Sequence, residues 1–259
     1  MTRSVRYEVD KNVAVLTLDS PATRNALSDE MLDELLAALE RARDNDGVRV
    51  VVLASSHERV FSAGGDLKAF ASGTPTITKY AGLDRFPRLY QMIGGLGKPV
   101  ICAVGGDALA GAFGLALSCD FVLAKESANF GCPEINVGVF PFMISALIYR
   151  NVARIKANEL MMCGEKITAV EALELGFVNR VIPDADFDAE VRTWAERLAG
   201  KSPLLMRLGK DAINKTRDMS LPDALAALQS QLALAFATDD VREGVTAFLE
   251  KRPPVWGMK

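Results

Sequence analysis

Histidine is almost absent from this chain of 259 residues, and its single imidazole is that of His57. It lies in the polar segment 55–59, SSHER, which is typical of a solvated surface loop. A serine or cysteine nucleophile would therefore have one candidate imidazole base, which we expect at the surface. Cysteine is scarce, and without short paired spacing the four thiols indicate neither a zinc site nor a disulfide framework. They are Cys102, Cys119, Cys132 and Cys163.

Charge of one sign and long apolar runs are also lacking. The chain has 30 Lys and Arg against 33 Asp and Glu, a net charge of −3 that gives no indication of nucleic acid as a partner. The longest apolar run, residues 108–117, is far shorter than the roughly 20 residues of a membrane helix. The amino terminus lacks the apolar stretch of a signal peptide. We therefore expect a cytoplasmic protein with no metal site and no nucleic-acid or membrane partner.

The glycine motifs of nucleotide and hydrolase sites are missing as well. No G-x-G-x-x-G fingerprint and no G-x-S-x-G elbow occurs. Residues 94–98, GGLGK, resemble a phosphate loop, but Met92 stands where the first glycine should be and Pro99 follows the lysine. These absences argue against dinucleotide binding, phosphate-loop chemistry and the α/β-hydrolase mechanism.

What the chain does have is an alternation of strands and helices in an ordinary globular composition. It is 49% hydrophobic, enough for a sizeable core in one domain or in one domain with an appendage. Strand–crossover–strand units of this length predict an α/β fold with parallel pairing and right-handed crossovers. Strands are expected at residues 13–18, 50–53, 99–104 and 121–124, and helices from the N-cap Ser28 to about residue 44, at 89–93 and at 111–118.

After about residue 140 the pattern becomes helical. One strand, at residues 178–182, interrupts it, and a break at 200–203 indicates a boundary before a terminal group of helices. The helical periods cover residues 159–162, 169–175, 185–198, 204–216, 221–236 and 241–249.

Two glycine turns stand out in this pattern, FSAGGDLK at residues 61–68 and LAGAFG at 109–114. Each is expected to follow a strand and to precede a helix, where free backbone N–H groups can meet a ligand oxygen. The carboxyl ends of parallel strands are also where open α/β sheets bind ligands. The alternative is that each glycine pair serves only as a tight turn.

One acid, Glu134, follows the second turn in the apolar stretch 130–135, FGCPEI. Partial burial there would raise the pKa of its carboxyl group and allow it to exchange protons near neutral pH. The alternative is an acid at a helix N-terminus, stabilised by the helix dipole, because Pro133 suits the first position of a helix. The residues themselves leave both interpretations open.

Several phrases, in this order and at these intervals, resemble the crotonase superfamily, the enoyl-CoA hydratase/isomerase family. They are NALS at residues 25–28, FSAGGDLK at 61–68, Gly111, PE at 133–134, ITAVEALELG at 167–176 and EGVTAFLEKR at 243–252. The similarity runs nearly end to end. It implies a crotonase-like α/β fold, a spiral core of ββα units followed by a C-terminal helical region. It further implies an acyl-CoA-binding catalytic core in residues 1–200 and a helical trimerisation region in residues 201–259.

The resemblance also assigns roles. The backbone N–H groups of Gly65 and Gly111 would hold the thioester oxygen of an acyl-CoA as it gains negative charge, and Glu134 would move the proton. Coenzyme A would be part of the substrate, with no separate cofactor, and the assembly would be a homotrimer or homohexamer. For Lys251 the alternative is a solvated helix end. Matched to coenzyme A contacts are Arg24, Ala63, Gly65, Asp66, Leu67 and, from a neighbouring subunit, Phe248 and Lys251.

The chain departs from the family pattern in ways that bear on the reaction. Family hydratases usually carry two glutamates, but Gly114 stands where the first should be, and residues 141–144, PFMI, replace a glycine-rich stretch. Moving a double bond needs one base, whereas activating water suits two carboxylates. Isomerisation of an enoyl-CoA is therefore favoured slightly over hydration, and restoring the acid as Gly114→Glu should raise hydration more than isomerisation. A non-catalytic acyl-CoA-binding protein is the alternative of another class. The expected pocket wall includes Phe113, Phe140 and part of residues 80–93.

Overall fold

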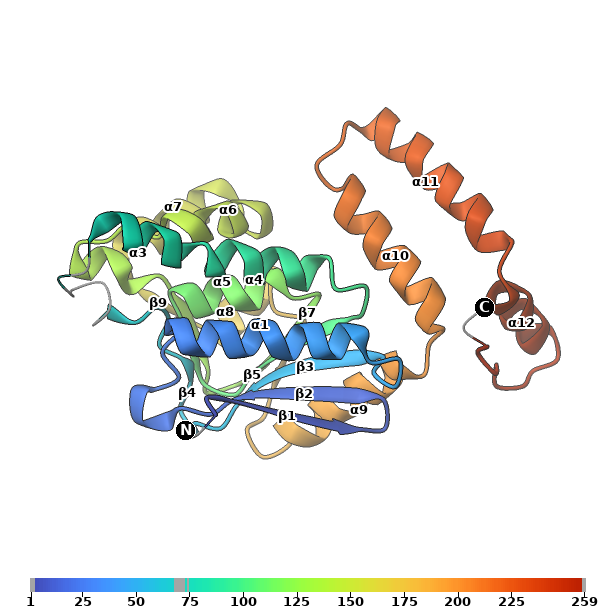
Figure 1. Ribbon diagram of the computed structural model, residues 1–259, viewed down its shortest axis with the longest axis horizontal. Coiled ribbons are helices and arrows are strands. Elements are labelled where there is room, and N and C mark those ends of the chain that lie inside the picture. Colours follow the sequence, from blue (N-terminus) through green and yellow to red (C-terminus); the bar gives the residue numbers. More distant parts are fainter. Residues whose placement is uncertain (1–2, 68–72, 74, 258–259) are drawn as a thin grey trace.

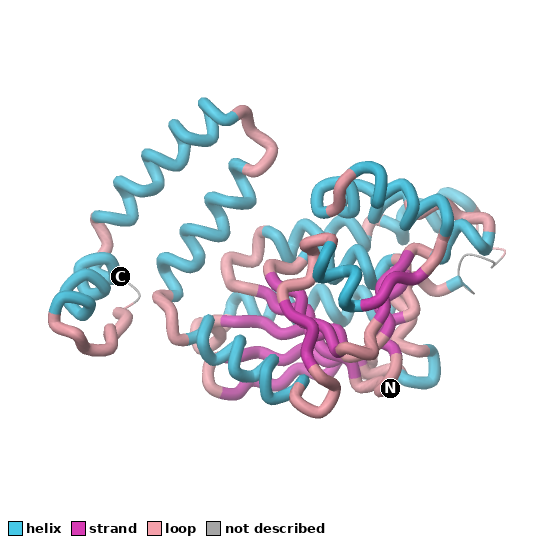
Figure 2. Tube along the Cα trace, turned by 180° about the vertical axis from the view of Figure 1, so that it is seen from behind, coloured by secondary structure: helices cyan, strands magenta, loops and turns pink. Residues whose placement is uncertain are grey.

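The computed structural model describes residues 3–67, 73 and 75–257 (Figure 1). Two β-sheets and the helices packed on them form a body, from which three C-terminal helices extend (Figures 1 and 2). The larger sheet is parallel from its second strand onward, and β1 pairs antiparallel with β2. In spatial order its strands are β1 (Val5–Asp10), β2 (Val13–Leu18), β3 (Val50–Ser55), β5 (Val100–Val104), β7 (Phe121–Lys125) and β10 (Arg180–Ile182).

A smaller sheet of short strands lies beside the larger one. Its strands are β4 (Val60–Ser62), β6 (Asp107–Leu109), β8 (Asn129–Gly131) and β9 (Lys166–Thr168), in that spatial order. The first three are parallel, and β9 runs antiparallel to β8. Each of β3, β5 and β7 is followed within a few residues by a strand of the smaller sheet. The chain therefore alternates between the sheets in the repeated ββα manner expected for a crotonase-like spiral.

The larger sheet separates two hydrophobic cores. One core contains the buried faces of α1, α4 and α5, and the other lies under α9 (Figures 1 and 2). The helices of the body are α1 (Asp29–Asp44), α3 (Thr76–Leu83), α4 (Arg85–Gly94), α5 (Gly111–Ser118), α6 (Phe142–Asn151), α7 (Arg154–Cys163), α8 (Ala169–Glu174) and α9 (Phe187–Ala199), with the short 3-10 helices η1 (Pro21–Thr23) and η2 (Pro133–Val137).

The elements expected from strong local patterns are confirmed. The valine-rich residues 50–53 form a strand buried on both faces, as a parallel sheet covered by helices requires. Helix α1 begins after Ser28, whose side chain accepts the N–H of Met31 at 3.2 Å. Its apolar face buries Leu35 and Leu39 completely. The α/β fold with parallel pairing is therefore correct.

Five strands were not predicted from the sequence: β1, β4, β6, β8 and β9. Four of them are only three residues long, too short to show an alternation of apolar and polar side chains. The fifth, β1, is an edge strand with mostly exposed residues. Pro87 lies inside the first turn of α4, where its missing N–H costs no helical hydrogen bond.

The C-terminal arm consists of α10 (Pro203–Thr216), α11 (Leu221–Phe236) and α12 (Asp239–Leu249), and it projects away from the body (Figures 1 and 2). Within the described residues, neither hydrophobic core includes a residue after Ala199. A polar contact anchors the arm: Lys210 Nζ lies 2.6 Å from Asp120 Oδ2, which also accepts the N–H of Val100 at 2.7 Å. Among residues 3–67, 73 and 75–257, no helix is long and apolar enough to cross a membrane.

Candidate active site

Three neighbouring parallel strands of the smaller sheet end at the candidate site. Gly65 follows the end of β4, Gly111 follows β6 and Glu134 follows β8. Because the carboxyl ends of parallel strands lie at one edge of a sheet, three segments far apart in sequence come together there. The glycine turns lie at strand ends, as predicted, but the strands belong to the smaller sheet. All three residues are partly exposed, as contact with a ligand requires.

The buried side chain of Asn25 organises the first glycine turn. Its amide oxygen accepts the N–H of Ser20 at 2.7 Å, and its Nδ2 lies 2.9 Å from Ser55 Oγ and 3.2 Å from the Phe61 carbonyl oxygen. Asn25 adopts a positive φ of 52°, which asparagine tolerates better than most residues. Asn25 belongs to the family phrase NALS but had no predicted role, and the structure shows that it ties the loop before α1 to the end of β4.

The two glycine turns touch each other. Gly64 has a φ of 86°, and a Cβ atom on it would lie 2.7 Å from the carbonyl oxygen of Leu109 and 3.2 Å from the backbone nitrogen of Gly111. Only glycine permits both this backbone conformation and this approach. Among the described residues, the N–H groups of Gly65 and Gly111 have no hydrogen-bond partner. Two free donors are therefore held on adjoining turns.

The second turn has an unusual backbone. Ala110, the residue before α5, adopts φ 53° and ψ −126°, a conformation that costs a residue with a Cβ atom about 1–3 kcal/mol. Its N–H donates to the carbonyl oxygen of Gly131, at the end of β8, at 2.9 Å. The strained residue thus connects the second turn to the strand that leads to Glu134.

Glu134 lies in η2 with Pro133 at the first position, as the sequence indicated. Its Oε2 atom is buried and has no hydrogen-bond partner in the described part of the chain. Burial raises the pKa of the carboxyl group, and a hydrogen bond from its own backbone N–H opposes the shift only in part. The interpretation as a partly desolvated acid is favoured, because a carboxylate that only capped a helix would have a lowered pKa.

The position of the missing acid is closed by other side chains. A Cβ atom on Gly114 would lie 2.5 Å from Ile144 Cγ2 and 2.9 Å from the Tyr90 hydroxyl oxygen. Real Cβ atoms do not approach other atoms so closely, so a larger residue requires Ile144 or Tyr90 to move. Gly114 on α5 and Ile144 on α6 are complementary in shape, because the Ile144 side chain fills the space that a side chain at position 114 would need.

Tyr90 is a site residue that the sequence did not reveal. Its hydroxyl group donates to the carbonyl oxygen of Gly111 at 2.9 Å. Burial raises the pKa of this phenol strongly, and the nearby charge of Glu134 raises it further, so the hydroxyl stays protonated. The only sequence signal was its place in the segment 80–93, which was expected to line the pocket.

The expected pocket wall needs one correction. Phe113 is completely buried and packs against the rings of Phe130 and Phe177, with centroids at 5.9 and 5.2 Å. Phe113 therefore belongs to the hydrophobic core and does not line the expected pocket. Phe140 is half-buried and contacts Phe142, which is largely exposed. The exposed apolar residues that follow Glu134 in the chain include Ile135 and Val137 of η2 and Phe142 of α6.

The residues matched to coenzyme A contacts fall into two groups. Arg24 and Ala63 are joined by a hydrogen bond from the Ala63 N–H to the Arg24 carbonyl oxygen at 3.0 Å, and both belong to the first turn region. Asp66 and Leu67 follow directly, and Leu67 is exposed. Phe248, 82% exposed, lies on α12 and Lys251 just after it. Figure 1 shows α12 beside the start of the arm, where Asp240 bonds to Ser202, and well away from α5 of the same chain.

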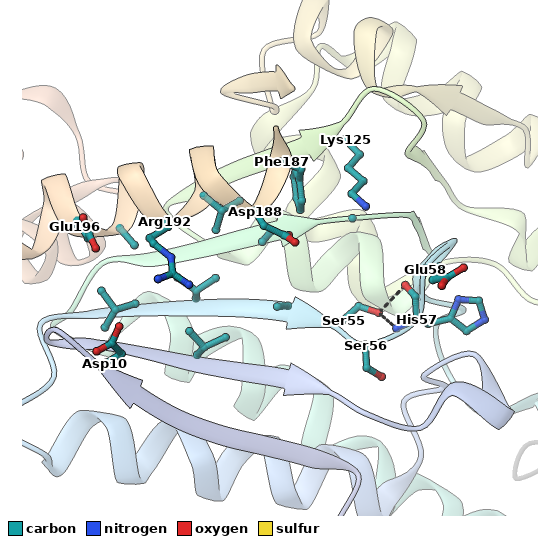
Figure 3. A pocket seen from close by; sticks show the side chains of 18 of the residues that line it. Asp10, Ser55, Ser56, His57, Glu58, Lys125, Phe187, Asp188, Arg192 and Glu196 are labelled. Atoms are coloured by element: carbon teal, nitrogen blue, oxygen red, sulfur yellow. Dashed lines mark hydrogen bonds between the residues drawn. The ribbon is translucent and has the colours of Figure 1, made fainter. Parts of the chain in front are cut away.

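A cavity of about 330 Å³ lies elsewhere, between α9 and the strands β2 and β3 (Figure 3). It contains His57 but none of Gly65, Gly111 and Glu134. His57 is half-buried, and its Nδ1 atom accepts the N–H of Arg59 at 3.1 Å. The cavity is therefore separate from the two glycine turns and from Glu134. In the described residues, no group of three His, Cys, Asp or Glu is placed to hold a metal ion.

Known proteins share the sequence pattern and the fold of this chain. A profile of the enoyl-CoA hydratase/isomerase family matches residues 8–259. The chain is 36% identical to 2,3-dehydroadipyl-CoA hydratase of Escherichia coli over 94% of each protein, and 34% identical to crotonyl-CoA hydratase of Syntrophomonas wolfei over 96% of each. The crystal structure of an enoyl-CoA hydratase from Mycobacterium smegmatis superposes with a TM-score of 0.94 at 32% identity, over 98% of both chains. The chain has the crotonase fold and is an enzyme of the enoyl-CoA hydratase/isomerase family.

Proposed function

We propose that this enzyme moves a proton along the acyl chain of an enoyl-CoA, with Glu134 as the only acid–base group. The unpartnered, buried Oε2 atom of Glu134 carries this proposal. No group of the described chain occupies the lone pairs of this oxygen, and the raised pKa of the carboxyl group suits proton exchange near neutral pH.

The backbone N–H groups of Gly65 and Gly111 would receive the thioester oxygen. Both are free of partners in the described chain and lie on turns in contact with each other. Removal of a proton next to the thioester carbonyl puts negative charge on that oxygen, and fixed donors stabilise the charge. The same electron pair then spreads to the neighbouring double bond.

Isomerisation of a 3-enoyl-CoA to a 2-enoyl-CoA follows from one base. The Glu134 carboxylate takes a proton from C2, the double bond shifts from C3–C4 to C2–C3, and the protonated Glu134 returns the proton to C4. The reaction consumes no water and needs no redox group. Coenzyme A is the part of the substrate by which the enzyme would bind it. Position 114, where a second acid would hold water, is closed by Ile144 and Tyr90.

Hydration of a 2-enoyl-CoA is the second candidate. The observation that favours it is the naming of the E. coli and S. wolfei relatives as hydratases. In this chain, Glu134 alone would have to orient and deprotonate the water. We rank this reaction second because water held by one carboxylate is less well positioned than water held by two.

The C-terminal arm supports an assembly of several copies. Helix α11 buries none of its residues in the single chain, and its leucines lie exposed. An apolar surface of this kind is typical of a subunit interface. We propose a homotrimer or homohexamer with residues 1–200 as catalytic core and 201–259 as trimerisation region. There, Phe248 and Lys251 of one subunit would reach the coenzyme A bound to another.

Turnover of matched 3-enoyl-CoA and 2-enoyl-CoA substrates tests the proposal, with wild type, Glu134→Gln and the control Glu174→Gln. Glu174 is exposed and lies on α8, so its variant should keep full activity. We expect faster conversion of the 3-enoyl substrate and a loss of about 10³-fold in Glu134→Gln. Faster hydration of the 2-enoyl substrate would reverse the ranking. Tight binding without Glu134-dependent turnover of either substrate would refute both reactions.

A further inference from the structure

The strained backbone at Ala110 needs support from its surroundings. A non-glycine residue at φ 53° and ψ −126° keeps this conformation only where neighbouring groups impose it. Two hydrogen bonds enclose the residue. Its own N–H donates to Gly131 at 2.9 Å, and the carbonyl group of the next residue, Gly111, accepts from Tyr90 at 2.9 Å.

Helix α4 presents two rings to the first turn of α5. Phe86 and Tyr90 are four residues apart and therefore on one face of α4. A Cβ atom on Gly111 would lie 2.9 Å from Phe86 Cε1, so this ring limits movement of the turn on one side. The Tyr90 hydroxyl holds the turn through the Gly111 carbonyl group.

Stability alone does not account for the hydroxyl group. The Gly111 carbonyl belongs to the first residue of α5, and such a carbonyl already accepts a helical N–H one turn later. Phenylalanine at position 90 would therefore leave no acceptor unsatisfied and would keep the ring contacts with Phe86 and Gly114. The hydroxyl group instead fixes the orientation of the peptide groups on either side of Gly111, through its hydrogen bond to the Gly111 carbonyl oxygen.

We propose that Tyr90 is a positioning residue for the reaction: its hydroxyl group, bonded to the Gly111 carbonyl, fixes the first turn of α5 so that the Gly111 N–H points at the developing enolate oxygen. This inference rests on the proposed function of Gly111 as an oxygen-binding donor. A fixed donor benefits the charged state more than the neutral thioester, because the neutral oxygen gains little from close alignment. Tyr90 should thus affect kcat more than KM.

The test compares Tyr90→Phe with the control Tyr149→Phe. Tyr149 is half-exposed on α6 and its hydroxyl bonds to Asn158, away from both glycine turns. Two ligands are titrated: a saturated acyl-CoA thioester, and a CoA thioether that carries a nitronate in place of the enolate. The kcat and KM values for the 3-enoyl substrate and the melting temperatures are measured alongside.

We expect Tyr90→Phe to weaken nitronate binding about tenfold and to lower kcat by a similar factor. The affinity for the saturated thioester and KM should change less than about twofold, and Tyr149→Phe should leave all values unchanged. Equal weakening of both ligands, an unchanged kcat, or a variant recovered only unfolded would each overturn the positioning role. Failure of the wild type to prefer the nitronate would instead count against the proposed function of the glycine turns.

Discussion

The candidate site lies between two segments that differ in packing. Helix α5 buries six of its eight residues, whereas η2 buries none of its five. On the α5 side, a Cβ atom at position 114 would overlap Ile144, while a Cβ atom added to Gly138, at the end of η2, would meet no atom within 4 Å. We call these segments the α5 side and the η2 side.

The difference between the two sides matches the groups that each contributes. In the proposed reaction the α5 side would supply a backbone N–H, which would act through its fixed direction and so gain from dense packing. In the proposed reaction the η2 side would supply Glu134, which would meet substrate protons on more than one carbon. A carboxylate at the margin of the packed region can be desolvated enough to raise its pKa and still be reached by a substrate.

The largest effect is expected from Gly114→Glu, which places a carboxylate inside the densely packed α5 side. We expect this variant to lower the free energy of unfolding by about 3 kcal/mol or more, because the cost of overpacking the core is added to the cost of burying an acid. The increase in hydration expected from the sequence must be revised, since the acid has no room unless Ile144 is also shortened. Urea unfolding and turnover of a 2-enoyl-CoA measure both effects. The control Ala189→Glu adds the same charge at an exposed position in the first turn of α9 and should be nearly neutral.

A double-mutant cycle of Gly114→Ala and Ile144→Ala sharpens the comparison at one contact. Alone, Gly114→Ala should cost about 1–3 kcal/mol of unfolding free energy, because its Cβ atom meets Ile144 Cγ2. In the Ile144→Ala background the same change should cost at least about 1 kcal/mol less. Strictly additive effects, measured by urea unfolding, would show that the overlap is relieved elsewhere.

The η2 side predicts an effect of pH on stability through Glu134. The folded-state pKa of this carboxyl group is raised above 4.5, so folding favours the protonated form. Its contribution is therefore fully present below the unfolded-state pKa and is lost as pH rises through the folded-state value. Glu134→Gln should gain stability over wild type at about pH 7–8, by about 1 kcal/mol at most because solvent reaches part of the side chain, and the gain should vanish near about pH 4.

Thermal unfolding from about pH 4 to 8 checks this prediction, with Glu174→Gln as the control that should show no such trend. The same raised pKa predicts that kcat/KM of the wild type falls on acidification with a midpoint above 4.5. A Glu134→Gln variant that is less stable than wild type at the alkaline end of this range would contradict the account of a desolvated carboxylate.

The smallest effect is expected from Ala110→Gly, at the strained start of the α5 side. Glycine adopts φ 53° and ψ −126° without a Cβ penalty, which offsets the entropy that glycine loses on folding. The unfolding free energy should change by about 0.5 kcal/mol or less. The exposed Ala37→Gly in α1 should cost about 1 kcal/mol. Equal losses in the two variants would argue against strain at Ala110.

Much of the fold and part of the site could be predicted because their signals are local. Residues 50–53 read as a buried strand without any tertiary information, and Ser28 marks the start of α1. Gly64, Gly65 and Gly111 were conspicuous because glycine is needed where the backbone must turn sharply or be approached closely. The three-residue strands that align these turns left no such signal, since their stability comes from pairing with distant strands.

The sequence by itself determined five of the six strands of the larger sheet, the two glycine turns and the single acid at position 134, because each depends on residues close together in the chain. Only the tertiary structure decided what surrounds them. The closure of position 114 by Ile144 and Tyr90, the bond from Tyr90 to Gly111 and the unpartnered oxygen of Glu134 all arise where the described segments α4, α5, α6 and η2 meet. Contacts between segments so far apart follow from how the volumes of whole helices fill a common core, and no local pattern encodes that packing.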